Sequence, residues 1–515
     1  MRLLAVLAAT VSVGAAVSVA APASAHGDRQ HVERARAAVV APGSTPVTSD
    51  NVAQLSSNPS QVGISGCFLK TKPLFVTSGL DSVRVWDVSD AAHPAQVGVL
   101  TSGQFENEAM NCGERKTSTG TRRFALIGID AVQAAPGDFQ HVNAGGNEMV
   151  VVDVTRASEP KIISRAPSTT STHTVACVVE TDCTYVYSAG EGNHFSIFDL
   201  RNLAKPHEVD AKPDQPGVQP FWSPTAGHKW NFDAAGIGTH TGWNGASMWR
   251  TTNPARPRLI TTTGDAGKGT DPKYVGWNNF ILHNSFRPNA GAFKANSAPS
   301  FAHGNVMLAT EEDYEQTDCT QAGSFQTWWV KRLDGTESAI VPLDKVELSD
   351  LGNFPLPQGT FCSSHWFDFR PGGLVAVGFY GGGTQVIDAR DPQNLKSFGY
   401  AVGGASEVWD SMWVPVYDQS GRQTRARSNV VYSIDLVRGL DVYAVDVPGD
   451  GIGAVPSSNV VPQRSVVDRA SDGAVPMGLA GGAMALAIAV RRRGRRAAAR
   501  RNHRHSRSPA PPGPV

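Results

Sequence analysis

The alternation of apolar and polar positions over residues 82–100 predicts a strand, a turn and a second strand. In SVRVWDVSDAAHPAQVGVL, Val83 and Val85 alternate with other residues, and a second alternating run follows Pro94. Asp87 falls at the predicted end of the first strand, where its carboxylate can accept the free N–H groups of the turn. Pro94 cannot donate a ladder hydrogen bond, so the strand that it opens should lie at a sheet edge.

The same unit returns along the chain. Six further stretches share its alternation and, in most cases, its Asp or Pro: residues 149–160, 195–206, 247–257, 324–333, 384–392 and 439–447. Units spaced roughly 40 to 80 residues apart, with about four strands in each, are typical of a β-propeller. The sequence therefore predicts an all-β fold, a seven-bladed β-propeller over residues 46–447.

The region of roughly residues 46–447 resembles a known repeat, and three of the copies are close to it. The runs V-W-D-V-S-x-x-x-x-P at 85–94 and V-V-V-D-V-T-x-x-x-x-P at 150–160 look like the LVIVD repeat, a bacterial and archaeal relative of WD-type repeats found largely in secreted or surface proteins. The resemblance implies a propeller architecture. It leaves the activity open, because a fold does not specify a function.

The two ends of the propeller are expected to meet. The copy at 439–447 ends its blade one strand short, and residues 48–56 could supply the missing outer strand. Ring closure across the termini would remove an open sheet edge.

The amino-terminal residues predict export. Arg2 precedes an apolar run over 3–21, and the small residues A-S-A stand at 23–25. This is the pattern of a secretory signal peptide at 1–25, and the polar residues that follow disfavour a membrane anchor. The mature chain is expected to begin near His26 with a flexible leader at 26–45.

The carboxyl-terminal residues predict a membrane anchor. A linker rich in Gly, Pro, Ser and Val at 448–472 leads to the uncharged run 473–490, and nine arginines follow it within a basic tail at 491–515. The run is just long enough to span a bilayer as a transmembrane helix, and the arginines place the tail in the cytoplasm. A buried core helix would not end in such a block of arginines, so we expect the protein to be anchored to the cell membrane with the propeller outside. We also expect it to be a monomer.

The net charge of residues 26–490 bears on the kind of partner that the protein can bind. Without residues 1–25 and 491–515 the chain has 36 basic and 46 acidic residues. An acidic body argues against nucleic acid and is compatible with cations.

Six cysteines in an exported chain favour disulfides. Cys177 and Cys183 flank a predicted turn, so they should pair. The pairs Cys67–Cys112 and Cys319–Cys362 are predicted from neighbouring blades, with free buried thiols as the alternative. Because the cysteines do not form C-x-x-C pairs, a zinc–thiolate site is disfavoured.

Candidate chemistry lies at the predicted starts of the innermost strands, which surround the axis of a propeller. Six such starts carry a histidine or a glutamate: Glu108, His173, His228, His283, His365 and Glu407. The first three histidines are spaced by 55 residues, about one blade. Converging imidazoles would bind a transition metal such as Cu, Fe or Zn, with the two glutamates completing the shell or orienting the histidines. The alternative is that these residues hydrogen-bond one another and water.

The predicted arrangement is similar to that of two enzyme families. Carotenoid-cleaving oxygenases are seven-bladed propellers whose iron is held by four axial histidines, and the selenium-binding-protein and methanethiol-oxidase family has a histidine-rich channel. The local motifs of those families are missing here, so the similarity is one of architecture.

Other residues are weaker candidates for a functional site. The acidic run Glu311, Glu312 and Asp313 is compatible with calcium, although such runs are usually solvated loops. His240 is either a supporting residue of the axial cluster or simply buried. Trp328, Trp329, Trp409 and Trp413 are interpreted first as core residues, with a sugar-binding platform as the alternative. There is no serine elbow, phosphate loop or H-E-x-x-H, so hydrolase and nucleotide chemistry have no support.

Two classes of function remain. One is a surface-anchored binding or scaffold propeller for an unknown surface or envelope ligand. The other is a metal-dependent oxidoreductase, with copper or iron, acting at the axial cluster. The binding or scaffold propeller is the more common function for this repeat. Imidazole nitrogens from at least three blades around one point, within about 2.0 to 2.3 Å of it as for Zn or Cu, would favour the enzyme.

Overall fold

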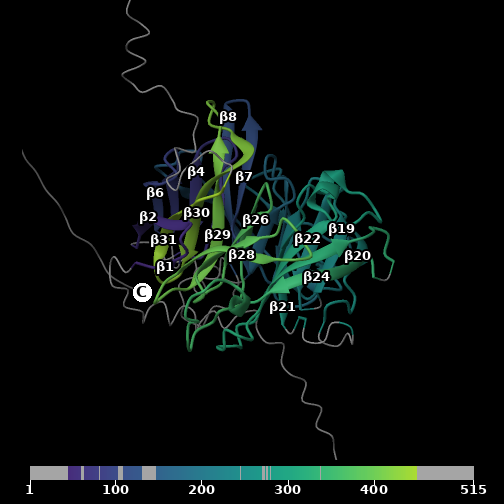
Figure 1. Cartoon of the computed structure of the whole chain (residues 1–515). Coiled ribbons are helices and arrows are strands. Elements are labelled where there is room, and N and C mark those ends of the chain that lie inside the picture. Colours follow the sequence, from purple (N-terminus) through teal and green to yellow (C-terminus); the bar gives the residue numbers. More distant parts are fainter. Residues whose placement is uncertain are drawn as a thin grey trace, which may run out of the picture. The chain divides into compact units, whose positions relative to one another are not determined.

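The described part of the chain consists of β-sheets arranged as blades around one axis (Figure 1). The computed structural model describes residues 45–448 except 60–62, 80–81, 102–107, 130–146, 244, 269–272, 274–276, 279 and 337. Seven sheets of at least four antiparallel strands form within these residues, which confirms the predicted seven-bladed propeller. The predicted signal peptide, linker, spanning segment and basic tail lie outside the described residues, as does nearly all of the leader.

The first three blades use the chain in order from the innermost strand outward. Blade 1 contains β3 (Ser65–Phe68), β4 (Leu74–Ser78), β5 (Ser82–Asp87) and β6 (Ala95–Thr101). Blade 2 contains β7 (Asn111–Thr117), β8 (Gly120–Ile129), β9 (Glu148–Asp153) and β10 (Lys161–Pro167). Blade 3 contains β11 (Thr174–Cys177), β12 (Tyr185–Ala189), β14 (Ile197–Asp199) and β15 (His207–Glu208), beside a short pair of β13 (His194–Phe195) and β16 (Phe221–Trp222).

The next three blades repeat this order. Blade 4 contains β17 (Gly227–Phe232), β18 (Ile237–Gly242), β19 (Gly245–Arg250) and β20 (Arg258–Thr262). Blade 5 contains β21 (Ile281–Phe286), β22 (Val306–Glu312), β23 (Phe325–Val330) and β24 (Ile340–Val346). Blade 6 contains β25 (Phe367–Arg370), β26 (Leu374–Gly378), β27 (Thr384–Asp388) and β28 (Lys396–Val402), with β1 (Val47–Thr48) added at its edge.

The last blade closes the ring. Its inner strands are β29 (Val408–Tyr417), β30 (Gln423–Asp435) and β31 (Gly439–Val445), and its outer strand is β2 (Val52–Asn58) from the other end of the propeller. Val52 pairs with Val445 in this antiparallel ladder. The predicted pairing of 48–56 with 439–447 is therefore confirmed from Val52 onward, whereas Thr48 belongs to the edge strand β1, which was not predicted and pairs with β28.

The repeat signature has the predicted physical basis. Asp87 Oδ1 accepts a hydrogen bond from the Ser89 N–H at 2.9 Å, and Asp153 Oδ1 does the same for Thr155 at 2.8 Å. The strand after the repeat proline is the outermost of its sheet in blades 1 to 4. Proline is tolerated there because an outer strand has unpaired N–H groups on one side.

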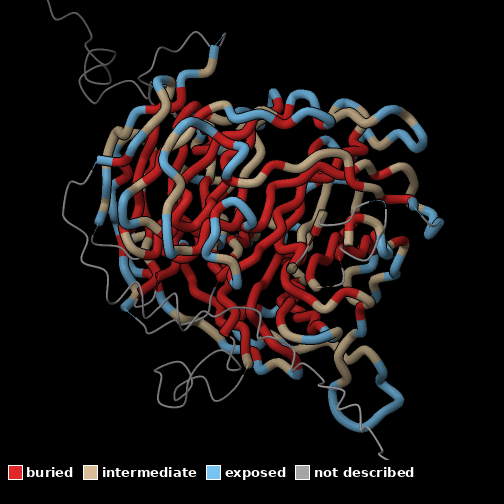
Figure 2. The backbone as a smooth tube through the Cα atoms, turned by 60° about the horizontal axis from the view of Figure 1, so that its bottom comes forward, coloured by how far each residue is buried: buried red, intermediate tan, exposed pale blue. Residues whose placement is uncertain are grey.

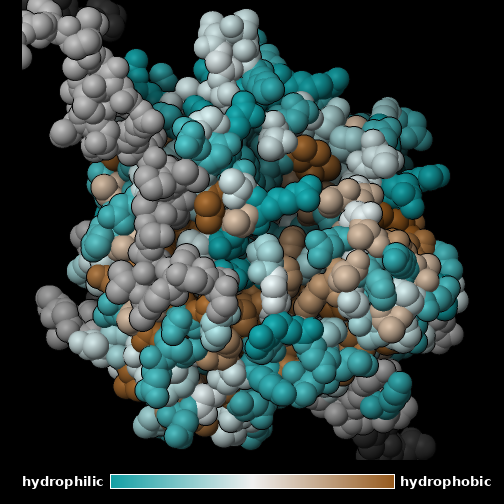
Figure 3. All heavy atoms as spheres, turned by 45° about the horizontal axis from the view of Figure 1, so that its top comes forward, coloured by the Kyte–Doolittle hydropathy of each residue, from teal (hydrophilic) through white to brown (hydrophobic). Residues whose placement is uncertain are grey.

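Apolar side chains fill the spaces between neighbouring blades, where Figure 2 shows the strands almost continuously buried. In one such cluster Val76 and Val85 of blade 1 pack with Val150 and Val152 of blade 2. The face seen in Figure 3 is mainly hydrophilic by comparison, with hydrophobic side chains in separate patches. Stability thus comes from cores between adjacent blades, and the axis is left for other residues.

All three predicted disulfides are present. Cys67–Cys112 joins the inner strands of blades 1 and 2, and Cys177–Cys183 closes a hairpin of blade 3. Cys319–Cys362 joins blade 5 to the segment that enters blade 6. Disulfides of this kind are typical of proteins in oxidising compartments.

The only helices among the described residues are short 3-10 turns: η1 (Ala290–Ala292), η2 (Phe301–His303) and η3 (Leu348–Asp350). Within the part of the chain that the structure describes, no helix has the length and apolar character needed to cross a bilayer. Membrane anchoring through residues 473–490 stays a prediction.

Ring closure can be tested by truncation. A chain that begins at residue 59 lacks β2 and should melt at a lower temperature and self-associate, because β31 is left as an open edge and Val431, Tyr443 and Val445 lose the cover of Val52. A chain that begins at residue 45 is the control and should behave like the parent in thermal unfolding and light scattering. Equal melting of the two truncated chains would contradict the closure.

The disulfides should contribute unequally. The loop closed by Cys67–Cys112 spans 45 residues and that closed by Cys177–Cys183 spans 6. Loop entropy predicts a loss of roughly 4 kcal/mol in the free energy of unfolding for the double Cys→Ala variant of the first pair and roughly 2 kcal/mol for the second. Denaturant titration would measure both, and a larger loss for the short loop would contradict this order.

Candidate metal centre

Three of the four axial histidines, His228, His283 and His365, lie at irregular points of the inner strands or just before them. His228 in β17 has no pairing partner in β18, because Gly227 pairs with Gly242 and the next pair is Lys229 with Thr241. His283 in β21 is skipped in the same way. Each is thus the extra residue of a β-bulge, a feature that re-aims side chains and recurs beside active sites.

His365 is placed by a similar irregularity just before β25. The backbone N–H of His365 donates to the carbonyl of Gly378, while the N–H of Gly378 donates to the carbonyl of Trp366. His365 and Trp366 therefore lie together opposite Gly378. The side-chain Nδ1 of His365 lies 2.8 Å from the carbonyl oxygen of Trp409. Because a carbonyl can only accept, Nδ1 carries the proton, and in the neutral ring Nε2 presents its lone pair.

The four histidines converge on the carboxylate of Glu108. His173 Nε2 contacts Oε2, and His228 Nε2 lies 3.6 Å from the same oxygen. His283 Nε2 lies 2.8 Å from Oε1 and His365 Nε2 lies 3.0 Å from it. The imidazoles come from four successive blades, as predicted, and each presents Nε2 to one point.

A second carboxylate, Glu312, flanks this point. Its Oε2 lies 3.7 Å from His283 Nε2, and its Oε1 lies 3.7 Å from His365 Nε2. The hydroxyl of Tyr380 donates to Oε1. Tyr380 has a φ of 45°, which bulky residues rarely adopt, and such conformations concentrate at functional sites.

The acidic run that contains Glu312 does not act as a unit. Glu311 accepts hydrogen bonds from the Phe280 N–H and the Ser324 hydroxyl, and Asp313 accepts one from the Glu315 N–H. Among the described residues, the groups of candidate metal ligands include Glu312 and neither of its neighbours, which gives no support to a calcium site formed by the run. Strand alternation could have separated Glu312 from Glu311, because adjacent residues of β22 face opposite sides.

The inner strand of blade 7 is offset from the predicted alignment. Its bulge falls at Trp409, between the pairs Val408–Asp435 and Asp410–Ile434. Glu407 therefore stands two residues before the axial position, where its Oε1 accepts a hydrogen bond from the Trp409 indole at 3.3 Å. None of the candidate ligand groups found in the described residues includes Glu407.

His240 is a core residue beside the cluster. It lies on β18, is fully buried, and stacks on the Trp230 ring with centroids 4.4 Å apart. Its Nδ1 is 2.9 Å from the Ser223 hydroxyl, and burial lowers its pKa to about 3. It is therefore neutral at physiological pH.

The cluster is sealed from solvent. The four histidines and Glu312 have no exposed surface, and Glu108 is 1% exposed. Three sets of ligand atoms lie within 4.8 Å of one another, and each contains two histidines and one glutamate: Glu108, His173 and His228; Glu108, His283 and His365; and His228, His283 and Glu312. Two imidazoles and a carboxylate form a donor set that suits Fe(II) and other divalent transition metals.

The electrostatics of the cluster favour a cation. Buried carboxylates are costly unless positive charge balances them. His365 Nε2 and Glu108 Oε1 are 3.0 Å apart, and both present lone pairs when the ring is neutral. A proton or a metal ion must then lie between them, and one divalent ion would balance both glutamates.

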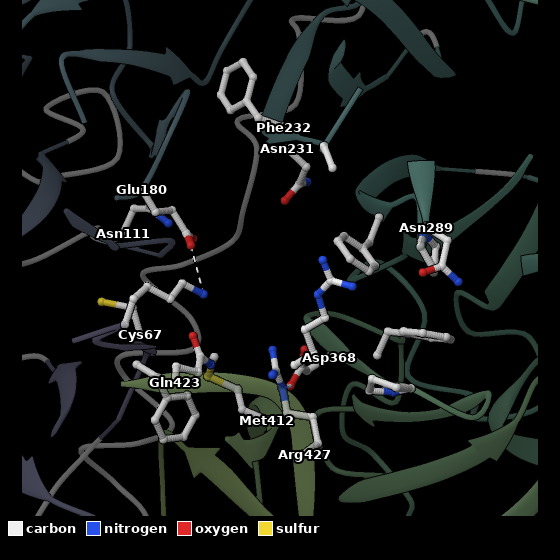
Figure 4. Close-up of a pocket in the computed structure, with 18 of the residues that line it drawn as sticks. Cys67, Asn111, Glu180, Asn231, Phe232, Asn289, Asp368, Met412, Gln423 and Arg427 are labelled. Atoms are coloured by element: carbon white, nitrogen blue, oxygen red, sulfur yellow. Dashed lines mark ion pairs between the residues drawn. The ribbon is translucent and has the colours of Figure 1, made fainter. Parts of the chain in front are cut away.

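A large cavity lies among the inner strands (Figure 4), and Lys229, the residue after His228, is part of its wall. It has a volume of about 1140 Å³ and is lined by residues of the inner strands of all seven blades. The third residue after the axial position contributes to its wall in blades 2 to 7: Asn111, Ala176, Asn231, Phe286, Asp368 and Met412. The channel therefore widens away from the histidines into a space large enough for an organic molecule.

Lys229 and Trp366 lie between the cavity and the cluster. The Trp366 ring centroid is 4.3 Å from that of His283, and the Lys229 Nζ is 5.0 Å from the Trp366 centroid. The Trp366 ring thus contacts both Lys229, on the cavity wall, and His283, in the cluster. Burial lowers the pKa of Lys229 to about 8.

Burial, assisted by the nearby Asp368 carboxylate, raises the pKa of Asp410 to about 8. This raised pKa predicts that the folded protein loses stability as the pH rises. An acid whose pKa is higher in the folded state than in the unfolded state lowers stability as pH rises from about 4 to about 8. Asp410→Asn should therefore raise the melting temperature more at pH 8 than at pH 5 in chelator-treated protein. Asp388→Asn, which removes a carboxylate whose pKa is lowered by hydrogen bonds from Arg390, should give no gain at either pH. A gain for Asp410→Asn that does not change with pH would contradict the assignment.

Comparison with known proteins defines no family for the chain. No protein-family model matches it, and neither does any curated protein. Among solved structures it is similar to the β-propeller domain of Cps50 (Swd1) from Myceliophteria thermophila, with a TM-score of 0.46 and 9% identity over 77% of this chain and 100% of that one. The functional conclusion therefore depends on the geometry of the axial cluster.

Proposed function

We propose that this protein is an exported, metal-dependent oxidoreductase whose transition metal binds at the axial cluster. The observation that carries the proposal is the convergence of four imidazole Nε2 atoms, from four successive blades, on the buried carboxylate of Glu108. Convergence from at least three blades is the feature that favours an enzyme over a binding or scaffold propeller.

The residues divide into ligands and supports. His173, His228, His283 and His365 offer neutral nitrogen donors, and Glu108 offers a carboxylate on the same axis. Glu312 faces the same Nε2 atoms of His283 and His365 at 3.7 Å, so it would be a second carboxylate donor. The Tyr380 hydroxyl holds it in place. A bound iron or copper ion would supply the redox chemistry.

A purely structural role for the metal has weak physical support. The blades are joined by apolar clusters between neighbours, by the β2–β31 ladder and by three disulfides. The fold is therefore stabilised at positions away from the axis. Two buried glutamates on the axis add a desolvation cost, which functional sites commonly carry.

Substrate access is supported by the cavity. Lys229 lines the cavity, its Nζ lies 5.0 Å from the Trp366 ring centroid, and that centroid lies 4.3 Å from that of His283. A substrate at Lys229 would therefore approach the ligands through the Trp366 ring. The enclosed site excludes bulk water, which strengthens electrostatic interactions within it.

Cellular placement is part of the proposal. The three disulfides support an oxidising compartment. The predicted signal peptide at 1–25 and the predicted spanning segment at 473–490 support export with retention at the membrane, the LVIVD-like repeats being typical of surface proteins.

The test is metal content. Purified wild-type protein should contain or take up Cu or Fe by elemental analysis, and His283→Ala should weaken metal binding at least tenfold because a direct ligand is lost. His240→Gln is the matched control, since His240 is equally buried and lies outside the cluster. It should keep the metal of the wild type. Both variants should remain folded in thermal unfolding.

Two results would contradict the proposal. Unchanged metal content in His283→Ala would exclude His283 as a ligand. Wild-type protein that stays empty after chelation and exposure to Cu, Fe and Zn would exclude the metal centre altogether.

A further inference from the structure

Lys229 is a buried cation that faces the axial cavity. It is 7% exposed, lines the cavity, and stands on β17 directly after His228. Its Nζ lies 5.0 Å from the centroid of the Trp366 ring, and within the described chain no carboxylate oxygen lies within 4.0 Å of it. An ammonium group in such a place is costly without an anionic partner.

The other basic residues of the cavity mostly have partners. Lys70 pairs with Glu180 at 3.0 Å, and Arg427 lies 3.6 Å from Asp368. Arg390 pairs with Asp388 on the rim. The cavity wall holds five basic residues and two acidic ones: Lys70, Lys229, Arg390, Arg425 and Arg427 against Glu180 and Asp368. The wall is therefore positive in a protein body that is acidic, and the carboxylates that stabilise the Lys229 charge, Glu108, Asp410 and Glu180, act from beyond 4.0 Å.

One side of the cavity is aromatic. Phe369 lies between Phe301, with ring centroids 5.1 Å apart, and Phe286, with centroids 6.2 Å apart. Phe286 is 40% exposed although it is a large apolar side chain on an inner strand. Exposed aromatic surface inside a concave site is typical of a place where a ligand buries its own apolar part.

We infer that the cavity binds an organic anion that has a carboxylate and an aromatic or otherwise apolar body. The carboxylate would lie at the Lys229 Nζ, where a charge-assisted hydrogen bond satisfies the buried ammonium. The body would lie against Phe286, Phe301 and Phe369, and the cavity of about 1140 Å³ accommodates a molecule of several rings. The sequence alone did not single out Lys229, because its significance depends on contacts across the channel.

The inference goes beyond the proposed metal chemistry and does not depend on it. Lys229 and the aromatic wall belong to the cavity, whereas the metal ligands lie beyond Trp366. If both hold, the anion occupies the position from which a substrate would approach the metal. Binding to metal-free protein tests the cavity alone.

The experiment compares a matched pair of probes on the full chain after chelation. Isothermal titration should give naphthalene-2-carboxylate a dissociation constant at least about tenfold lower than that of the neutral naphthalene-2-carboxamide. Lys229→Met should abolish this preference, and Lys229→Arg should retain it. Lys331→Met is the control, because the Lys331 Nζ lies 4.8 Å from the Trp329 centroid in the same kind of contact but outside the cavity. It should leave the preference unchanged.

Several outcomes would overturn the inference. They are equal affinity of the wild type for both probes, no binding of the carboxylate, and a preference that survives in Lys229→Met. A preference that appears only after metal loading would place the carboxylate on the ion and would also overturn it. Loss of metal content in the proposed ligand variants, with the probe preference intact, would support both sites independently.

Discussion

Closure of the ring is the constraint on which the axial site depends. When β2 completes the blade of β29, β30 and β31, the inner strands of all seven blades are held around one axis. Residues at the same position of successive inner strands then have to approach one another. Small irregularities decide what meets there, since the bulges at His228 and His283 turn the extra residue of each strand toward the centre. The chemistry of the site is thus a consequence of propeller geometry and of one bulge position repeated by blade.

Charge balance at the axis follows from this crowding. Two glutamates and four histidines share a volume without solvent, and the hydrogen bond of His365 Nδ1 to the Trp409 carbonyl directs a ring nitrogen lone pair at Glu108. Negative charge and lone pairs that point at one another repel in a low dielectric. The arrangement is stable when a cation lies among them, and a divalent metal would provide this charge at the place where the donor atoms meet.

The sequence predicts most of what depends on local pattern. The strand units, the turn aspartates, the closing strand and all three disulfides could be predicted because each leaves a signal within one or two blades. The four histidines and Glu108 could be predicted by aligning the inner strands. Glu407 was aligned two residues from the axial position because the bulge at Trp409 cannot be seen in the sequence. Glu312, on a second strand, and Lys229, across the channel from Trp366, gain their roles only from contacts between blades.

The most direct test of the central claim is anomalous diffraction from crystals of the metal-loaded protein, collected at the absorption edge of the bound metal. The account predicts a peak on the propeller axis, within about 2.0 to 2.3 Å of the Nε2 atoms of at least three of His173, His228, His283 and His365. A protein that holds metal but gives its anomalous peak elsewhere, with the four imidazoles bonded only to Glu108 and water, would contradict it.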